Sequence, residues 1–238
     1  MKHALITGGN HGIGLAIAKK LVADGCKVAV CSRFKEATLN ALAGTGILWY
    51  HCDVQSEYDI KRTISDIVDE WGCLDILVNN VGGGGRWGKY DPCETSEDVW
   101  KEVYQKNAGA ATLFTMQAIP LMRLNKWGRV VTITSIYGGK ESGGRSWFEM
   151  AKAAQVALMK SLSKHKPYVR DGITFNSIAP GYIEIDGKPE YEGVDNLPLG
   201  RMGKPEEVAN VVSFLCSEGA SLVNGAQIVV DGGESHAF

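Results

Sequence analysis

Short apolar runs rich in β-branched residues alternate with longer helical patterns along the 238-residue chain, and this alternation constrains the fold more than any other feature. The seven runs read HALIT, KVAVCS, ILWYHCDV, LDILVNN, GRVVTITS, ITFNSIAP and AQIVVDGG. Strands that are separated by helices pair in parallel through right-handed crossovers, and the helices then cover both faces of the sheet. The sequence therefore predicts an α/β fold with a doubly wound, seven-stranded parallel sheet.

Helices are expected between these runs. The predicted helices cover residues 14–24, 34–42, 59–71, 96–124, 147–166 and 205–217. No repeat or low-complexity segment interrupts the pattern, so we expect one domain over residues 1–238. The stretch 181–198 is too short to separate two domains and is predicted to be a substrate flap.

Composition limits the class of partner. The formal net charge of -2 and the pI of about 6.2 provide no overall basic field for nucleic acid or for an anionic membrane surface. No apolar run has the length of a membrane span, and the first strand follows Met1 too closely to leave room for a signal peptide. We expect a cytoplasmic protein that acts on a small molecule.

The cysteines show neither metal-ligand spacing nor the pattern of a disulfide framework. They are Cys26, Cys31, Cys52, Cys73, Cys93 and Cys216. Without CxxC pairs or histidine-rich spacing, the sequence indicates reduced thiols and predicts no metal site.

The glycine-rich stretch TGGNHGIG lies directly between the first apolar run and the first helix. Gly8 can turn sharply, Gly12 lets the backbone approach a pyrophosphate, and Gly14 permits close packing of helix on sheet. The helix N-terminus then offers free N–H groups and a positive dipole end to phosphates. A simple tight turn would show the same glycines, but their place after the first strand favours a Rossmann-type dinucleotide site.

The end of the second apolar run carries Ser32 and Arg33, where many dinucleotide folds carry an acid. An acid at this point bonds the ribose 2′-hydroxyl, whereas an arginine accepts a 2′-phosphate. The sequence therefore favours NADP(H) over NAD(H). The alternative is that Arg33 is a solvated surface charge.

Several ordered motifs over nearly the whole chain together resemble the short-chain dehydrogenase/reductase family. They are TGGNHGIG, HCDV with Asp53, NNVG at residues 79–82, KNAG with Asn107, ITS with Ser135, APG with Pro180 and Gly181, PLGRMGKPEEVA, and VDGG. The resemblance implies hydride transfer between a nicotinamide and a carbonyl or alcohol carbon of a small substrate.

The resemblance also implies site residues. Ser135 would hydrogen-bond the substrate oxygen, Lys152 would bind the nicotinamide ribose and lower the pKa of a tyrosine, and Asn107 would hold a water on a proton relay. The implied cofactor-binding residues are Gly8, Asn10, His11, Gly12, Ile13, Gly14, Ser32, Arg33, Asp53, Val54, Asn80, Gly82, Lys152, Pro180, Gly181 and Ile183.

One catalytic position departs from the family. The family tyrosine lies thirteen residues after the serine and four before the lysine, and Phe148 stands there. Three interpretations remain open. The chain is an inactivated form, an enzyme with a relocated proton source, or a module that keeps nucleotide affinity for regulation. The relocated source would be Tyr137, two residues beyond Ser135, or a water held by Ser135 and Lys152.

The expected substrate cleft has basic and aromatic neighbours. They are Arg86, Trp87, Lys140, Arg145 and Trp147. Such groups can hold a polar or anionic substrate by stacking and bidentate pairing, or they are surface residues around an apolar pocket. Ile185 stands where the family often has a threonine that bonds the nicotinamide amide.

The predicted helix 147–166 is apolar on more than one face, as its residues Met150, Ala153, Val156 and Ala157 show. A helix that covers only a sheet would show a single apolar stripe. The pattern therefore indicates burial against a second subunit as well, and the family resemblance implies a homo-oligomer, a tetramer or a dimer.

Overall fold

The computed structural model describes residues 1–89, 91–139, 145–185 and 191–235. Its strands form one parallel sheet in the order β3-β2-β1-β4-β5-β6-β7, which confirms the predicted doubly wound fold. The strands are β1 (His3–Thr7), β2 (Lys27–Ser32), β3 (Leu48–His51), β4 (Ile76–Asn79), β5 (Gly128–Ile133), β6 (Ile173–Pro180) and β7 (Gln227–Val230).

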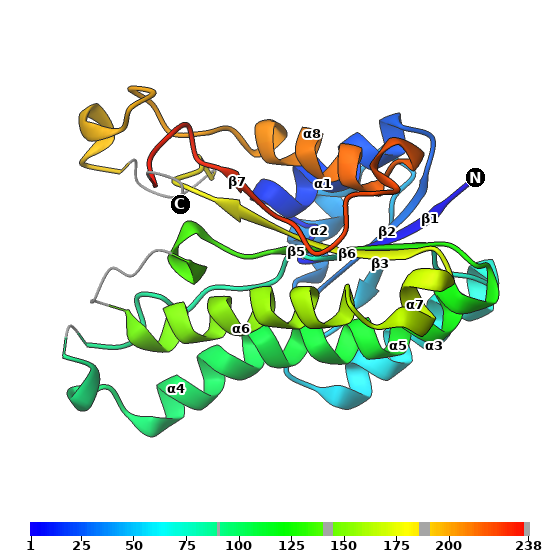
Figure 1. Ribbon diagram of the computed structural model, residues 1–238, viewed down its shortest axis with the longest axis horizontal. Helices are drawn as coiled ribbons and strands as arrows, with labels where there is room; N and C mark the ends of the chain where they lie inside the picture. The colour runs from blue at the N-terminus through cyan, green and yellow to red at the C-terminus, as the bar shows by residue number, and fades with distance from the viewer. Residues whose placement is uncertain (90, 140–144, 186–190, 236–238) are drawn as a thin grey trace.

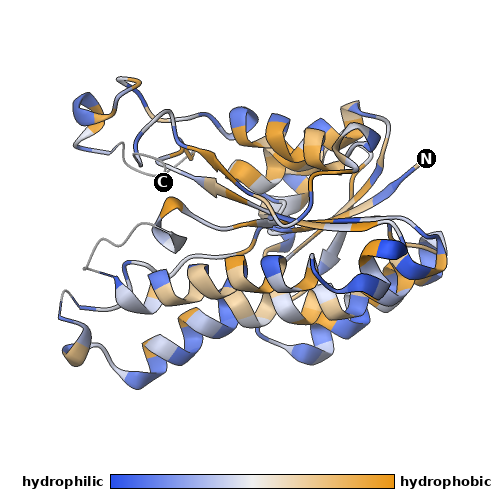
Figure 2. Ribbon diagram, in the orientation of Figure 1, coloured by the Kyte–Doolittle hydropathy of each residue, from blue (hydrophilic) through white to orange (hydrophobic). Residues whose placement is uncertain are grey.

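Helices connect successive strands. They are α1 (Gly12–Ala23), α2 (Lys35–Leu42), α3 (Glu57–Trp71), α4 (Glu97–Tyr104), α5 (Ala110–Leu124), α6 (Ser146–Leu162), α7 (Lys166–Arg170) and α8 (Pro205–Cys216). In Figure 1, α1 and α8 lie on one face of the sheet, and α4, α5 and α6 lie on the other. Figure 2 shows apolar residues in the central strands and on the helix sides that face them, with hydrophilic residues outside.

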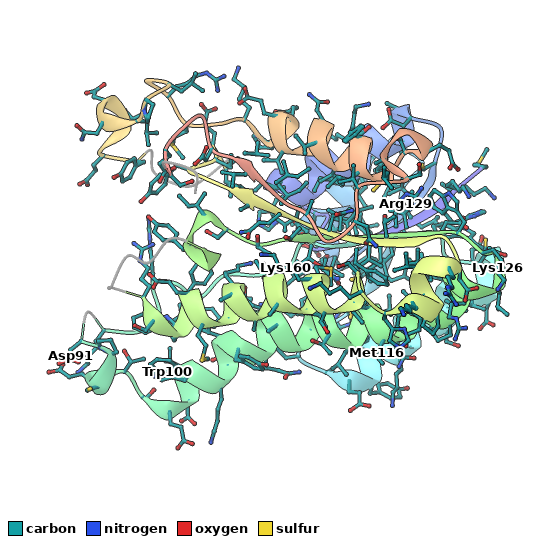
Figure 3. The ribbon with its side chains drawn as sticks, viewed as in Figure 1. Asp91, Trp100, Met116, Lys126, Arg129 and Lys160 are labelled. Carbon is teal, nitrogen blue, oxygen red and sulfur yellow. The ribbon has the colours of Figure 1, made fainter. Side chains whose placement is uncertain are left out.

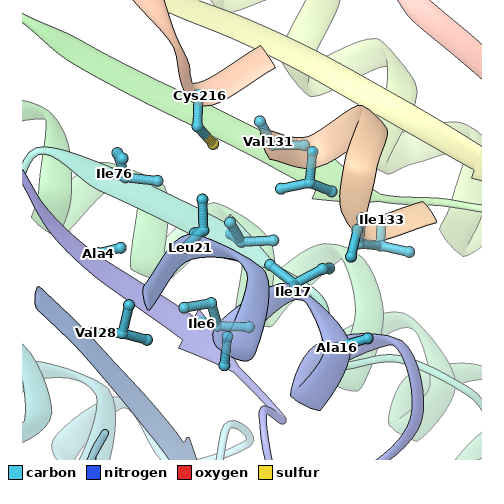
Figure 4. Packing of buried hydrophobic residues seen from close by; sticks show 14 of the residues in the cluster. Ala4, Ile6, Ala16, Ile17, Leu21, Val28, Ile76, Val131, Ile133 and Cys216 are labelled. Atoms are coloured by element: carbon cyan, nitrogen blue, oxygen red, sulfur yellow. The ribbon is translucent and has the colours of Figure 1, made fainter. Parts of the chain in front are cut away.

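The two faces of the sheet bury separate apolar clusters. On the α1 and α8 side, Ile17 and Leu21 pack with Ile6 from the sheet (Figure 4). Val212 of α8 belongs to the same cluster. On the other side, residues of α3, α5 and α6 cover strands β4 to β6, and Phe175 is fully buried there. Both faces of the central strands are thus covered, which is why these strands read as nearly continuous apolar runs.

The predicted long helix 96–124 is three segments in the structure. A π-helical turn, Gln105–Gly109, joins α4 to α5 and contains Asn107. Single π turns inside helices often occur at functional sites. Sequence periodicity predicted the helical stretch but not this widened turn.

The predicted helix 147–166 is shorter at its C-terminal end. Helix α6 ends at Leu162, and a separate short helix, α7, begins at Lys166. Pro167 lies in the first turn of α7. A proline lacks the N–H that a continuing helix needs, so it favours a new helix start over an extension of α6.

Within the described ranges, none of the helices combines the length and apolar character that a membrane crossing requires. All six cysteines belong to those ranges and are free thiols, as the sequence predicts.

The buried aromatic core gives a first prediction. Phe175→Ala removes a fully buried ring and should lower the free energy of unfolding by about 3–5 kcal/mol in urea denaturation of the nucleotide-free protein. Phe34→Ala is the matched control because its ring is 60% exposed, and it should cost less than about 1 kcal/mol. Equal costs for the two variants would contradict the described core.

Candidate functional site

A cleft of about 470 Å³ lies at the carboxyl ends of the strands. Every predicted cofactor-binding residue contributes to its wall, as do Ser135, Phe148 and Lys152. Residues from widely separated stretches of the sequence thus meet at one edge of the sheet. Sequence reasoning did not include Phe34, Gln55, Val81, Gly83 or Lys106, which also line the cleft.

Hydrogen bonds hold the glycine loop against the residues that follow β4. Asn80 Nδ2 donates to Thr7 O at 2.9 Å and to Gly8 O at 3.2 Å, while Thr7 Oγ1 accepts from the backbone N–H groups of Asn80 and Val81. A Cβ on Gly14 would lie 2.4 Å from Gly8 O and 2.5 Å from Asn80 Nδ2. The loop can close this tightly only because residue 14 has no side chain.

The far end of the cleft carries two cations, Arg33 and Lys106, that form no ion pair within 4 Å in the described residues. Arg33 lies over the ring of Phe34, with 5.5 Å from Cζ to the centroid. Burial lowers the pKa of Lys106, and the nearby charge of Arg33 lowers it further. Two neighbouring cations that repel each other are suited to an anionic ligand group. The sequence signal for Lys106 was its place directly before Asn107.

Other polar groups at this end are already engaged. The hydroxyl of Ser32 lies 2.7 Å from Thr38 Oγ1 and accepts from Trp49 Nε1 at 3.0 Å. One carboxylate oxygen of Asp53 accepts from the backbone N–H of Gln55 at 3.0 Å. The side chains of Ser32 and Asp53 therefore belong to the hydrogen-bonded frame of the cleft.

Lys152 is the most perturbed group of the cleft. Its Nζ donates to Ile133 O at 3.1 Å and lies 5.6 Å from the centroid of the Phe148 ring. Burial lowers the pKa of Lys152 to about 7. No ion pair to Lys152 occurs in the described part of the chain, so its charge is buried without a counter-charge.

Asn107 lies behind the cleft wall and is fully buried. Its Oδ1 accepts from Gly83 N at 3.1 Å, and its Nδ2 donates to Gly83 O at 2.9 Å and to Val103 O at 2.8 Å. A Cβ on Gly82 would lie 2.6 Å from Asn107 Oδ1 and 2.7 Å from Lys152 Nζ. The backbone at residues 82 and 83 is thereby threaded between the asparagine and the lysine.

Ser135 follows β5 and begins a 3₁₀ turn, Ile136–Gly138, in which its Oγ accepts from Tyr137 N at 3.2 Å. The strand therefore does not continue to Tyr137, and the alternation that would point both side chains the same way is absent. The hydroxyl of Tyr137 lies 3.2 Å from that of Tyr182, whose ring stacks on Tyr191. The geometric premise for Tyr137 as a proton source is wrong.

The expected basic and aromatic groups lie in different surroundings, and Arg86 is exposed. Trp147 is buried, and its Nε1 donates to Gly84 O at 3.0 Å, so its expected place as a substrate-stacking ring is wrong. Trp87 is 45% exposed, and Lys106 Nζ lies 4.4 Å from its ring centroid. Arg145 lies over the ring of Tyr137. Lys140 falls outside the described residues.

The start of the predicted flap closes on the glycine loop. Ile185 lines the cleft, and its Cγ2 would lie 3.3 Å from a Cβ on Gly12. Residues 186–190 of the flap fall outside the described ranges. The stretch continues with a short 3₁₀ turn, Val194–Asn196.

Taken together, the cleft fits a nicotinamide dinucleotide. The glycine loop presents backbone where a Cβ would collide, and the N-terminus of α1 faces the same space. Lys152 is a buried cation that has no anionic or hydroxyl partner among the described residues. A nucleotide with phosphates and ribose hydroxyls supplies each of these missing partners.

The family comparison agrees with this geometry. The family model described as enoyl-(acyl carrier protein) reductase matches residues 8–235. The chain belongs to the short-chain dehydrogenase/reductase family. It is 34% identical over 238 residues to the 3-oxoacyl-[acyl-carrier-protein] reductase MabA of Mycobacterium tuberculosis, covering 98% of this chain and 92% of that protein.

Other relatives and solved structures extend the comparison. Dehydrogenase/reductase SDR family member 4 of Oryctolagus cuniculus is 34% identical over 98% of this chain and 93% of its own length. Actinorhodin polyketide ketoreductase, solved with NADPH, superposes with a TM-score of 0.91 at 29% identity over 99% of this chain and 98% of that one. Levodione reductase gives a TM-score of 0.89 at 30% identity, over 100% and 98% of the two chains. The chain is thus an NAD(P)-dependent oxidoreductase by family.

The pKa of Lys152 generates a second prediction. The unfolded chain keeps this proton up to about pH 10.4, whereas the folded chain loses it near pH 7. Between these values the unfolded state binds more protons, so this group makes stability rise with pH. The wild-type protein should therefore gain stability relative to Lys152→Met as the pH rises from 7 to 10, measured by urea unfolding without nucleotide. A difference that stays flat or falls with pH would contradict the buried, unpaired charge.

Proposed function

We propose that the chain is an NADP(H)-binding oxidoreductase for a carbonyl or hydroxyl group, in a form whose usual tyrosine acid is replaced by Phe148. The observation that carries this proposal is the place of Phe148. Its ring lines the same cleft as Ser135 and stands beside the buried Lys152, in a pocket that otherwise fits a nicotinamide dinucleotide. A phenyl ring fills that space but has no proton to give.

Each residue of the site has its own proposed role in binding and orientation. Bound nicotinamide supplies or accepts the hydride. Lys152 holds the nicotinamide ribose through its ammonium, and Ser135 hydrogen-bonds the substrate oxygen. Asn107 acts behind them, because its amide fixes the backbone of Gly83 at the edge of the same cleft. These groups bind and orient both reactants, which is the part of catalysis that survives the loss of an acid.

The proton source in this proposal is a water between Ser135 and Lys152. The pKa of about 7 makes Lys152 able to exchange a proton near neutral pH. The hydroxyl of Tyr137 pairs instead with Tyr182. The water is therefore favoured over Tyr137 as the replacement for the missing phenol.

The competing function is that of a catalytically silent nucleotide-binding protein. The position of Phe148 also favours this function, because its ring has no acidic group while all the residues proposed to bind the nucleotide line the cleft. Losing a positioned general acid typically lowers a rate by roughly 10²–10⁴-fold. Saturable NADPH binding without oxidation across a panel of carbonyl compounds would support this competing function.

Preference for NADP(H) over NAD(H) rests on the cation pair Arg33 and Lys106. Both line the cleft at the end of β2, and burial and mutual repulsion act on Lys106 there. A 2′-phosphate would relieve that repulsion and accept hydrogen bonds from the Arg33 guanidinium.

The proposed substrate is a small carbonyl or alcohol compound, in keeping with the reductase names of the relatives. The exposed ring of Trp87 lies 4.4 Å from Nζ of the cleft residue Lys106, and this aromatic and basic pair favours a polar or anionic substrate. The stretch 181–198 would act as the flap of a single domain over residues 1–238.

We also propose a homo-oligomer, a tetramer or a dimer, in the cytoplasm. Apolar residues of α6 remain exposed in the single chain, with Met150 43% exposed. Met116 on the neighbouring α5 is 48% exposed and points away from the sheet (Figure 3). A second copy that covers these helices would bury both side chains.

Restoring the phenol tests the catalytic proposal. Phe148→Tyr should raise NADPH-dependent turnover of a carbonyl substrate by roughly 10²–10⁴-fold, because it returns a general acid beside Lys152. Cofactor affinity should stay nearly unchanged, since the ring keeps its shape. Turnover is measured by steady-state absorbance at the nicotinamide band, and cofactor affinity is measured by a binding titration.

Phe148→Leu is the matched control, because it alters the ring without adding a hydroxyl and should give no gain. Tyr137→Phe in the unmodified background should leave turnover unchanged. Equal turnover for the tyrosine variant and the unmodified chain would overturn the place assigned to Phe148, and a loss in Tyr137→Phe would move the proton source to that hydroxyl.

Arg33→Ala tests the cofactor preference. Removing one charged hydrogen-bond donor to a phosphate costs about 1.5–3 kcal/mol, so NADPH affinity should fall roughly 10- to 100-fold. NADH affinity should hardly change. Arg170→Ala, at the end of α7 and away from the cleft lining, is the control and should affect neither ligand. An equal loss for both nucleotides would refute a 2′-phosphate contact.

A further inference from the structure

A second cluster of ligand-type side chains lies at the amino-terminal edge of the sheet, opposite the cleft. His3 begins β1, and Cys73 and Asp75 precede β4. Their side-chain ligand atoms all lie within 4.8 Å of one another. Arg129, at the start of the adjacent β5, marks the same edge in Figure 3. None of these residues takes part in the cleft.

The contacts converge on one atom. His3 Nδ1 lies 3.2 Å from Asp75 Oδ2 and 3.1 Å from Cys73 Sγ. A relay of the thiol–imidazole–carboxylate type would use the two different ring nitrogens, one for each partner. Here both partners approach the same nitrogen, so the three ligand atoms gather at one place. The Cys73 thiol can also donate to Trp71 O, 3.6 Å from its Sγ.

The separations suit a small cation. Zinc bonds of about 2.0–2.1 Å to nitrogen and about 2.3 Å to sulfur place tetrahedral ligands roughly 3.3–3.8 Å apart. The two distances to His3 Nδ1 fall just below this range. These two ligand pairs need to move only slightly outward to admit the ion, and the third pair, Cys73 with Asp75, lies within 4.8 Å.

The backbone holds the cluster in place. His3 N donates to Asp75 Oδ2 at 2.9 Å, and Asp75 N donates to His3 O at 3.0 Å. The next residues pair directly, with Ala4 opposite Ile76 in the β1–β4 ladder. The imidazole also packs on Trp71, with 5.2 Å between ring centroids. Rigid strands that meet in register give the ligands a preformed spacing.

The types of the three ligand groups indicate which class of metal ion would bind. A thiolate, an imidazole and a carboxylate together favour zinc over magnesium or calcium, which prefer oxygen ligands alone. A cysteine binds zinc as a thiolate, so binding would release the thiol proton to solvent.

We propose that His3, Cys73 and Asp75 bind one zinc ion that clamps β1 to β4, with water in the fourth position. Sequence motifs, which predicted no metal site, would not detect such a cluster because its ligands are separated by about seventy positions and share no short motif. The plain alternative is a hydrogen-bonded cluster in which Asp75 only anchors the first residues of β1.

Cobalt substitution tests the site on the full-length protein after chelator treatment. Titration with Co²⁺ should give a near-ultraviolet thiolate-to-cobalt band that saturates at one equivalent and is abolished by Zn²⁺. Zn²⁺ should also raise the melting temperature of the unmodified protein.

Two variants and one control make the test decisive. Cys73→Ser should lose the band, and His3→Gln should weaken cobalt binding at least tenfold, with folding of both checked by circular dichroism. Cys93→Ser removes an exposed thiol and should change nothing. No band in the unmodified protein, or a band that persists in Cys73→Ser, would overturn the proposal and leave the hydrogen-bonded cluster.

Discussion

The structure depends on the point at which the chain reverses its direction across the sheet. From β1 the chain moves outward through β2 and β3, and from β4 it moves the other way through β5 to β7. The loops after β1 and β4 therefore diverge and leave a crevice at the carboxyl ends of the strands, where ligands of such folds bind. Asn80 ties the two loops together across that crevice, and Gly14 lets them close.

Positively charged side chains that form no ion pair in the described residues gather in this crevice. Lys152 enters from α6 and is buried beneath the loops without a carboxylate partner in the described residues, and Arg33 and Lys106 meet at the other end. Each of these arrangements costs stability unless a ligand completes it. The positions of these charges match a ligand that carries phosphate and hydroxyl groups at separate places. Phe148 is the exception, an apolar ring in the position where the family carries its proton donor.

Local sequence patterns predicted much of the fold. Apolar runs and glycine placement predicted the strands and the dinucleotide loop because both depend on neighbours in the sequence. The π turn around Asn107 and the 3₁₀ turn at Tyr137 depend on long-range hydrogen bonds, and residue spacing does not encode them. Lys106 and the burial of Trp147 were missed for the same reason. The proposed zinc cluster needs two strands in register, which only the folded sheet provides.

Calorimetric titration of the unmodified protein with NADPH at pH 8, repeated in buffers of different ionisation enthalpy, tests the central claim most directly. The account predicts saturable binding with net proton uptake, because the bound nucleotide stabilises the charged form of Lys152 that burial alone disfavours. The uptake should vanish in Lys152→Met. Absence of saturable binding, or binding without proton uptake, would contradict a nucleotide cleft built around this lysine.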